Sequence, residues 1–436
     1  MKNYRSLLAI ALTLLMVISI YSMVSNSMSK ADDLKELLAE AKALEEEGLF
    51  ARAAGKYSEA IALDPQCSYY FTVADMYYEN GEYESSMAWC TEVMNAFPEE
   101  SGGYERMIRA CLGNESYKDA FKALDTAEGR GIMNERLEQY RREMKALHYV
   151  EYIAIQELVQ YSGGYHVVVK DEKWGVVSNT GSTILPMRYG KIGPMAAGIA
   201  PVCDAEGNWY LTDEEGLNVA NISLHLGQGV SDVSLYNDEL FAACVNGTYG
   251  YYDMEMNQVL NGYENAGAFN AGVAAVQKDG SWMLIDKKGN SINGEQYEDV
   301  VLDDRGICCL KNRILAKKDG KYLLLDNEGK RVGKSAFEDA HLPAGSELLA
   351  VKTNGLWGFV DIDGKTVIDA QYENAQSFSN GMAAVCVNGL WGFIDEGNVM
   401  CIEPAFLRCG NMTNSGTAFV ETNRGWMILK LYSHNY

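Results

Sequence analysis

Three patterns of apolar and polar positions divide the chain. An uncharged, largely apolar run extends from Leu7 to Val24. From about residue 31 to 163, apolar residues recur at steps of three and four, as in amphipathic helices. Beyond 163, short β-branched and aromatic runs are punctuated by glycine, which is typical of strands and turns. The pattern predicts a membrane anchor or signal peptide over 1–28, a helical domain over 31–163 and an all-β domain over 164–432.

The N-terminal run has the length of a membrane span. Eighteen residues of helix cover about 27 Å, close to the roughly 30 Å hydrocarbon core. Lys2 and Arg5 precede the run and would hold that end in the cytoplasm. No Ala-x-Ala site follows, and Ser25 and Ser27 offer only a weak cleavage site. We therefore expect a single-pass cell-membrane protein with extracytoplasmic domains, with secretion after signal cleavage as the alternative.

The helical region contains an internal repeat. The segment EEGLFARAAGKYSEAIALDP returns 33 residues later as ENGEYESSMAWCTEVMNAFP, so that Gly48 matches Gly81 and Pro65 matches Pro98. A third, degenerate copy follows around Tyr117. A period of this length indicates stacked helical hairpins. The stretch 134–160 is predicted to be one helix that caps the stack.

This repeat resembles the tetratricopeptide repeat. That family has a small residue at the helix crossing and a proline that ends the second helix, matched here by Ala53, Ala60 and Pro65. The resemblance implies an inner groove lined by the first helix of each repeat. Family members that capture a terminal carboxylate need basic and Asn residues in this groove, whereas this chain offers mostly acids. The matching positions are Lys42, Glu45, Asp75, Tyr78, Glu79 and Arg109.

The β region repeats with a mean period of 36 residues. Each unit has a Gly-x-Ala-x-Val strand, a polar turn, a strand that carries an aromatic, often a D-x-x-G turn, and a β-branched strand. A residue that recurs at one position in every unit is more typical of a core than of a sugar-stacking platform. The recurring aromatics are Trp174, Trp209, Tyr249, Trp282, Tyr322, Trp357, Trp391 and Trp426.

The D-x-x-G segments, such as Asp286 to Gly289, carry the signature of type I turns. A calcium site is the alternative, but each turn supplies one or two carboxylates where Ca²⁺ takes six to eight oxygens. We therefore expect turn chemistry and no metal.

The β units resemble the WG-repeat (KWG) family of bacterial proteins over about residues 164–432. The aromatic-glycine dipeptide is intact at Trp174-Gly175, Tyr249-Gly250, Trp357-Gly358 and Trp391-Gly392. Seven complete units and an extra hairpin near 418–431 can close into a propeller whose terminal strands complete one blade. An open β-solenoid is the alternative. The expected fold is a multidomain α plus all-β chain, with seven to eight β units.

Charge and chemistry narrow the function. A net charge of −23 argues against nucleic-acid binding. The ten cysteines form no C-x-x-C pair and the five histidines no ligand-spaced cluster. No nucleophile, phosphate-loop or dinucleotide motif is present. The sequence predicts a non-enzymatic, cofactor-free scaffold that binds protein or peptide partners. A carbohydrate or cell-wall binding module is the alternative, and an enzyme built on a propeller is less favoured.

Overall fold

The computed structural model describes residues 19, 28, 30–162 and 164–434. The chain forms two compact units that divide between Leu147 and His148. Apart from Ser19, the expected membrane segment Leu7–Val24 lies outside the described residues. Within the described part, no helix combines the length and the apolar character needed to cross a membrane.

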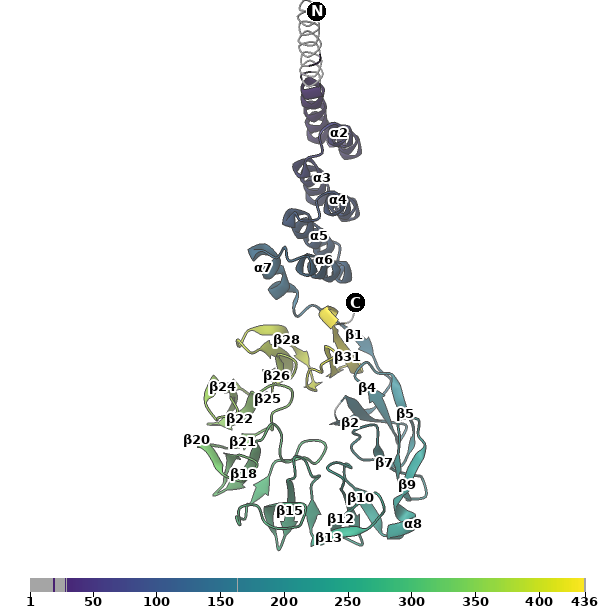
Figure 1. Cartoon of the computed structure of the whole chain (residues 1–436), viewed down its shortest axis with the longest axis vertical. Coiled ribbons are helices and arrows are strands. Elements are labelled where there is room, and N and C mark those ends of the chain that lie inside the picture. Colours follow the sequence, from purple (N-terminus) through teal and green to yellow (C-terminus); the bar gives the residue numbers. More distant parts are fainter. Residues whose placement is uncertain (1–18, 20–27, 29, 163, 435–436) are drawn as a thin grey trace, which may run out of the picture. The chain divides into compact units, whose positions relative to one another are not determined.

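The first unit is a series of helical hairpins (Figure 1). A helix that includes residues 30–46 packs against the next one in a cluster that contains Ala41 and Ala53. The third repeat, degenerate in sequence, is also a complete hairpin. Small residues make the close crossings possible: Ala53 and Ala60 are fully buried, and Ser86 donates a hydrogen bond to the Ala74 carbonyl at 2.8 Å. The later helices are α2 (Phe50–Leu63), α3 (Cys67–Glu79), α4 (Tyr83–Ala96), α5 (Ser101–Gly113), α6 (Tyr117–Gly129) and α7 (Glu135–Met144).

The predicted capping helix over 134–160 is wrong beyond Met144. Helix α7 starts as expected, with the Asn134 side chain accepting the Leu137 N–H at 3.0 Å. Residues 148–152 and 157–162 are strands instead. The first of them pairs with a strand near the C-terminus, and helical periodicity cannot reveal so distant a partner. The boundary between the domains therefore lies at 147, and not at 163.

The second unit is an eight-bladed β-propeller, and Figure 1 shows the blades following one another around a ring. We number the blades along the chain. Blade 1 consists of β2 (Glu157–Ser162), β3 (Tyr165–Lys170), β4 (Lys173–Ser178) and β5 (Thr183–Tyr189). Blade 2 consists of β6 (Lys191–Ile192), β7 (Ala200–Cys203), β8 (Trp209–Thr212) and β9 (Asn218–Asn221). Blade 3 consists of β10 (Val230–Val233), β11 (Phe241–Val245), β12 (Thr248–Tyr252) and β13 (Gln258–Tyr263). A short helix, α8 (Ile222–Leu226), follows β9.

Blade 4 has three strands, because single bridges from Trp282 to Tyr297 and from Ile285 to Ser291 replace a continuous fourth strand. Blade 4 consists of β14 (Asn265–Ala266), β15 (Ala274–Lys278) and β16 (Ser281–Ile285). Blade 5 consists of β17 (Asp299–Val300), β18 (Ile314–Lys318), β19 (Lys321–Leu325) and β20 (Arg331–Phe337). Blade 6 consists of β21 (Asp339–Ala340), β22 (Leu349–Thr353), β23 (Leu356–Val360) and β24 (Thr366–Tyr372). Blade 7 consists of β25 (Asn374–Ala375), β26 (Met382–Val387), β27 (Leu390–Asp395) and β28 (Met400–Phe406).

Blade 8 joins the two ends of the propeller. It consists of β29 (Arg408–Cys409), β30 (Thr417–Thr422), β31 (Gly425–Leu431) and the first strand, β1 (His148–Tyr152). Strand β1 pairs antiparallel with β31, from His148 opposite Leu431 to Tyr152 opposite Met427. This exchange covers the edge of β31 and ties the two ends of the propeller together. The prediction that terminal strands complete one blade is confirmed, and the propeller replaces the open solenoid.

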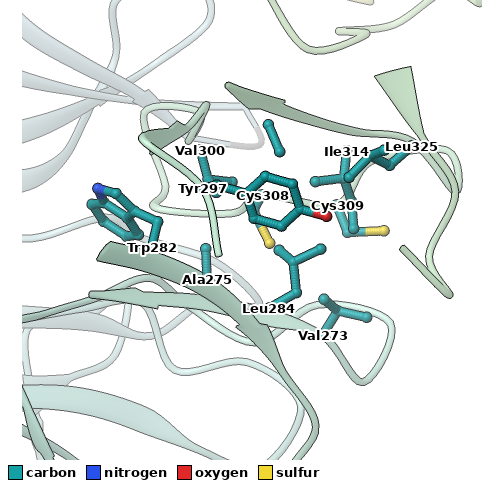
Figure 2. Packing of buried hydrophobic residues seen from close by; sticks show 11 residues of the cluster. Val273, Ala275, Trp282, Leu284, Tyr297, Val300, Cys308, Cys309, Ile314 and Leu325 are labelled. Carbon is teal, nitrogen blue, oxygen red and sulfur yellow. The ribbon is translucent and has the colours of Figure 1, made fainter. Parts of the chain in front are cut away.

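The propeller core lies between successive blades. Figure 2 shows Trp282 of blade 4 near Tyr297 and Val300, with Cys308 and Leu284 nearby. Each blade thus buries one face of its sheet against the next, which gives a chain of similar cores around the ring. All ten cysteines are free thiols, six of them buried, so they contribute apolar packing and no covalent link.

Candidate functional site

The recurring aromatics all lie on the third strand of a blade, and none of the eight is exposed. Trp209, Trp282, Tyr322, Trp357 and Trp426 are buried, and Trp174, Tyr249 and Trp391 are half-buried. Rings in these positions offer little free face on which a sugar could stack. Their burial supports the interpretation that they fill the interior of each repeat.

The glycine after the aromatic lets the outer strand approach. A Cβ added at Gly358 would lie 2.6 Å from the Ile368 carbonyl oxygen, and one at Gly175 would lie 2.9 Å from that of Leu185. The pairing with the outer strand shifts register beside this glycine in all four blades that keep the dipeptide. Blade 4, which has Met283 there, forms no continuous outer strand, and the outer strand of blade 8 comes from the other end of the chain.

The turn aspartates use their carboxylates within their own turns. Asp286 accepts the N–H groups of Lys288 and Asn290 at 2.9 and 2.8 Å, and its carbonyl accepts the Gly289 N–H at 2.9 Å. The side-chain amide of Asn290 lowers the pKa of Asp286 by stabilising the charged form. Within the described ranges, no three His, Cys, Asp or Glu side chains are grouped to hold a metal ion. The turn prediction is confirmed at these segments.

The helical unit brings together three of its six predicted groove residues. Asp75 and Tyr78 of α3 both contact Arg109 of α5: the carboxylate forms an ion pair with it, and the Tyr78 ring lies 4.1 Å from its guanidinium carbon. Lys42 and Glu79 are exposed and lie outside this group. Glu45 instead accepts a 3.4 Å hydrogen bond from Tyr57.

Two members of this group were missed from the sequence. Arg106 forms a 2.9 Å ion pair with Asp75 and lies 4.1 Å from the centre of the Phe71 ring. Arg106 is one helical turn before Arg109, and that spacing was the available signal. Phe71, Asp75, Tyr78, Arg106 and Arg109 together form what we call the groove cluster. All five are partly exposed.

The groove cluster combines one carboxylate, two guanidinium groups and two aromatic rings. Arg106 and Arg109 share Asp75, so the cluster carries one net positive charge. Apart from Asp75, residues 30–100 hold five Lys and Arg against fifteen Asp and Glu. Stacking fixes the plane of each guanidinium and leaves part of it in water, a common arrangement where proteins bind polar groups of a partner.

A cavity of about 450 Å³ lies in the propeller, lined by residues of blades 1, 5, 6, 7 and 8. Sequence reasoning did not predict it. The loop between β17 and β18 covers residues 301–313, against seven residues between β14 and β15. The longer spacing of 40 residues from Trp282 to Tyr322 was its signal. The other spacing of 40, from Trp209 to Tyr249, marks the segment that contains α8.

The charged groups of this loop are largely satisfied internally. Asp303 accepts the N–H groups of Arg305 and Ile307, both at 2.9 Å, and forms a 2.7 Å ion pair with the Arg305 guanidinium. His341, in the next blade, stacks on Trp357 at 4.8 Å between ring centres, and burial lowers its pKa. Near neutral pH the imidazole is therefore uncharged.

Comparison with known proteins gives one family match and several fold similarities. The family model described as "WG containing repeat" matches residues 174–209, 249–282 and 357–391. No curated protein is significantly similar to this chain.

Among solved structures, BamB from Moraxella catarrhalis has 11% identity and a TM-score of 0.41, covering 65% of this chain and 99% of its own. Hsv2 from Kluyveromyces lactis has 9% identity and a TM-score of 0.36, covering 64% and 96%. The Sgt2 TPR domain from Aspergillus fumigatus has 23% identity and a TM-score of 0.21, covering 25% and 78%. Similarities of this degree leave open what the chain binds.

Proposed function

We propose that this protein is a non-enzymatic scaffold that binds protein or peptide partners through its two repeat units, held at the cell envelope by its N-terminal segment. The groove cluster is the observation that carries the proposal. Its two arginines and two aromatic rings are partly exposed and oriented by each other before any partner arrives. Pre-orientation reduces the entropy that binding has to overcome.

The chemistry of the groove cluster suits a polypeptide. Arginine and tyrosine are enriched where protein interfaces hold most of their binding energy. A guanidinium stacked on a ring can still donate hydrogen bonds to carbonyl or carboxylate oxygens of a partner. The eight repeated propeller aromatics are buried or half-buried, which favours a peptide partner over the alternative of a glycan stacked on these rings.

The membrane and enzyme aspects of the proposal rest on the sequence. Lys2 and Arg5 ahead of the apolar run support an anchor with the repeat units outside the cytoplasm. The lack of nucleophile and cofactor motifs supports a binding role. Protease protection of the intact chain in membrane vesicles tests the orientation: digestion of the repeat units from the cytoplasmic side would contradict it.

The test of binding is capture from envelope extracts by the full chain, compared with Arg106→Ala/Arg109→Ala. We expect the double variant to bind the proteins that the wild type retains at least tenfold more weakly, which corresponds to about 1.4 kcal/mol of binding free energy. Arg52→Ala, an exposed arginine on the second helix of the first hairpin, is the matched control. Equal capture by the wild type and the double variant, with unchanged melting, would overturn the role of the groove cluster.

A further inference from the structure

We infer that the propeller cavity binds an uncharged peptide segment with one aliphatic side chain. The inference rests on the proposed binding function and names the partner chemistry of a second site, remote in sequence from the groove cluster. The cavity occurs where blade 5 departs from the repeat. Since the repeated residues build the blades, a unit-specific insertion is free to take another role.

The apolar residues that line the cavity come mainly from three blades. Blade 5 contributes Leu302 and Leu310, blade 6 contributes Leu342 and Pro343, and blade 1 contributes Leu158. These residues supply an apolar surface from three blades. A volume of about 450 Å³ falls within the range of roughly 300–1,000 Å³ that is usual for small-ligand pockets.

The amide side chains come from the two remaining blades. Gln376 belongs to blade 7, and Asn411 and Asn414 belong to the loop between β29 and β30 of blade 8. A carboxamide both donates and accepts hydrogen bonds and therefore matches a peptide group on both sides. The Oδ1 of Asn411 is buried and has no hydrogen-bond partner within the described chain. A buried acceptor of this kind needs a donor, which a peptide N–H supplies.

The charges around the cavity argue for an uncharged occupant. Arg305 is already paired with Asp303, His341 is uncharged near pH 7, and the remaining acidic or basic lining residue, Asp304, is exposed to solvent. A charged side chain entering this space would lose water without gaining a buried counter-ion. No Trp, Tyr or Phe is among the described residues that line the cavity, so these walls offer a sugar no ring on which to stack. An aliphatic side chain with its flanking peptide groups fits both sets of walls.

The probe is a blocked heptapeptide of glycine, serine and asparagine with a central leucine, labelled for fluorescence anisotropy and titrated with the full chain. Peptides with lysine or glutamate at the centre, and chitotetraose as a glycan probe, complete the panel. We expect the leucine peptide to bind at least tenfold more tightly than either charged peptide. Equal binding of all peptides, or binding of the glycan alone, overturns the inference.

Cavity variants locate the binding. Ala344 is exposed and lines the cavity, so Ala344→Trp should block it without disturbing the core and weaken leucine-peptide binding at least tenfold. Ala344→Ser is the matched control and should bind as the wild type does. Gln376→Leu should weaken binding by about tenfold, the effect of one lost hydrogen bond to the ligand. Gln371→Leu, exposed on the outer strand β24, should leave binding unchanged.

The two proposals fail in different ways. If Ala344→Trp binds the leucine peptide as well as Ala344→Ser does, with both variants melting like the wild type, the cavity inference is wrong. Capture that still depends on Arg106 and Arg109 would then leave the scaffold proposal intact. Unchanged capture by Arg106→Ala/Arg109→Ala, together with unchanged leucine-peptide binding by Ala344→Trp, would overturn both proposals.

Discussion

Blades 5 and 7 are built on the same repeat but differ in the aromatic-glycine dipeptide and in the loop that joins their first two strands. Blade 7 keeps Trp391-Gly392 and joins its first two strands by the six residues 376–381. Blade 5 replaces the dipeptide with Tyr322-Leu323 and joins the corresponding strands by residues 301–313, which carry Arg305 to the cavity. Both blades complete four strands. The comparison teaches that the repeated positions build a blade, and that residues outside the repeat are available for binding.

The largest expected effect tests whether the recurring aromatic holds a regular blade together. Trp357 is 4% exposed in blade 6 and packs in a cluster with Phe359, Ile368 and Phe378. Trp357→Ala should lower the free energy of unfolding by about 3–5 kcal/mol. Trp174→Ala, at the same position of blade 1 but only half-buried, should cost less. Urea denaturation of both variants measures the difference, and equal stability of the wild type and Trp357→Ala would contradict the repeat-core interpretation.

The seam between blades 8 and 1 differs from the regular seams because it buries a histidine. His166 of β3 is 3% exposed and packs against Phe419 of β30, with the two rings tilted and their centres 4.1 Å apart. Its Nε2 lies 3.0 Å from the Asn179 Oδ1. Burial lowers the pKa of His166 from 6.5 to about 4, because the charged ring would lose water. Protonation therefore opposes closure of the ring of blades at this seam.

The sign of the pH effect follows from that lowered pKa. The unfolded chain binds a proton at His166 below about pH 6.5, whereas the folded chain resists it until about pH 4. Stability should be fully present above pH 6.5 and fall by about 3 kcal/mol as the pH drops to 4. His341 changes in the same direction. The difference between wild type and His166→Phe in urea titrations at several pH values isolates the contribution of His166, and parallel curves would refute it.

The repeated part of this architecture could be predicted from the sequence, whereas features that lie outside the repeat could not. The D-x-x-G turns and aromatic strands depend on neighbours within about 40 residues, so local pattern was enough to place them. Strand β1 was read as helix because its partner, β31, lies almost 280 residues away. A further repeated feature was not predicted from the sequence. In it, a glutamate lies close in space to a turn from which it is distant in sequence. Glu264, Glu298, Glu338 and Glu373 each accept the N–H of a turn glycine 16–22 residues later.

The candidate sites show the same limit. Asp75, Tyr78 and Arg109 were found because the repeat register placed them on first helices, and Arg106 was missed because it lies off that register. The cavity draws on five blades, and its residues share no sequence pattern. Only the long spacing from Trp282 to Tyr322 pointed to an insertion there.

The smallest expected effect sharpens the comparison at the level of single glycines in blade 6. Gly355 has a φ of +81°, and an added Cβ would meet nothing within 4 Å, so its role is conformational. Gly358 lies outside the left-handed region, but an added Cβ would lie 2.6 Å from the Ile368 carbonyl oxygen and 2.7 Å from the Ala370 nitrogen, so its role is steric. The two glycines should therefore respond differently to the same substitutions.

Gly358→Ala should destabilise the protein by about 1–3 kcal/mol, because the outer strand has to move away. Gly358→Asn should cost more, since its side chain is larger. At Gly355 the order should reverse: alanine should cost about 1 kcal/mol and asparagine less, because asparagine tolerates positive φ. Thermal melting of the four variants gives the two orders. If asparagine is the better substitute at both positions, the glycine of the Trp-Gly dipeptide serves backbone conformation and not the close approach of two strands, and the distinction between blades that keep it and blades that lose it would need another cause.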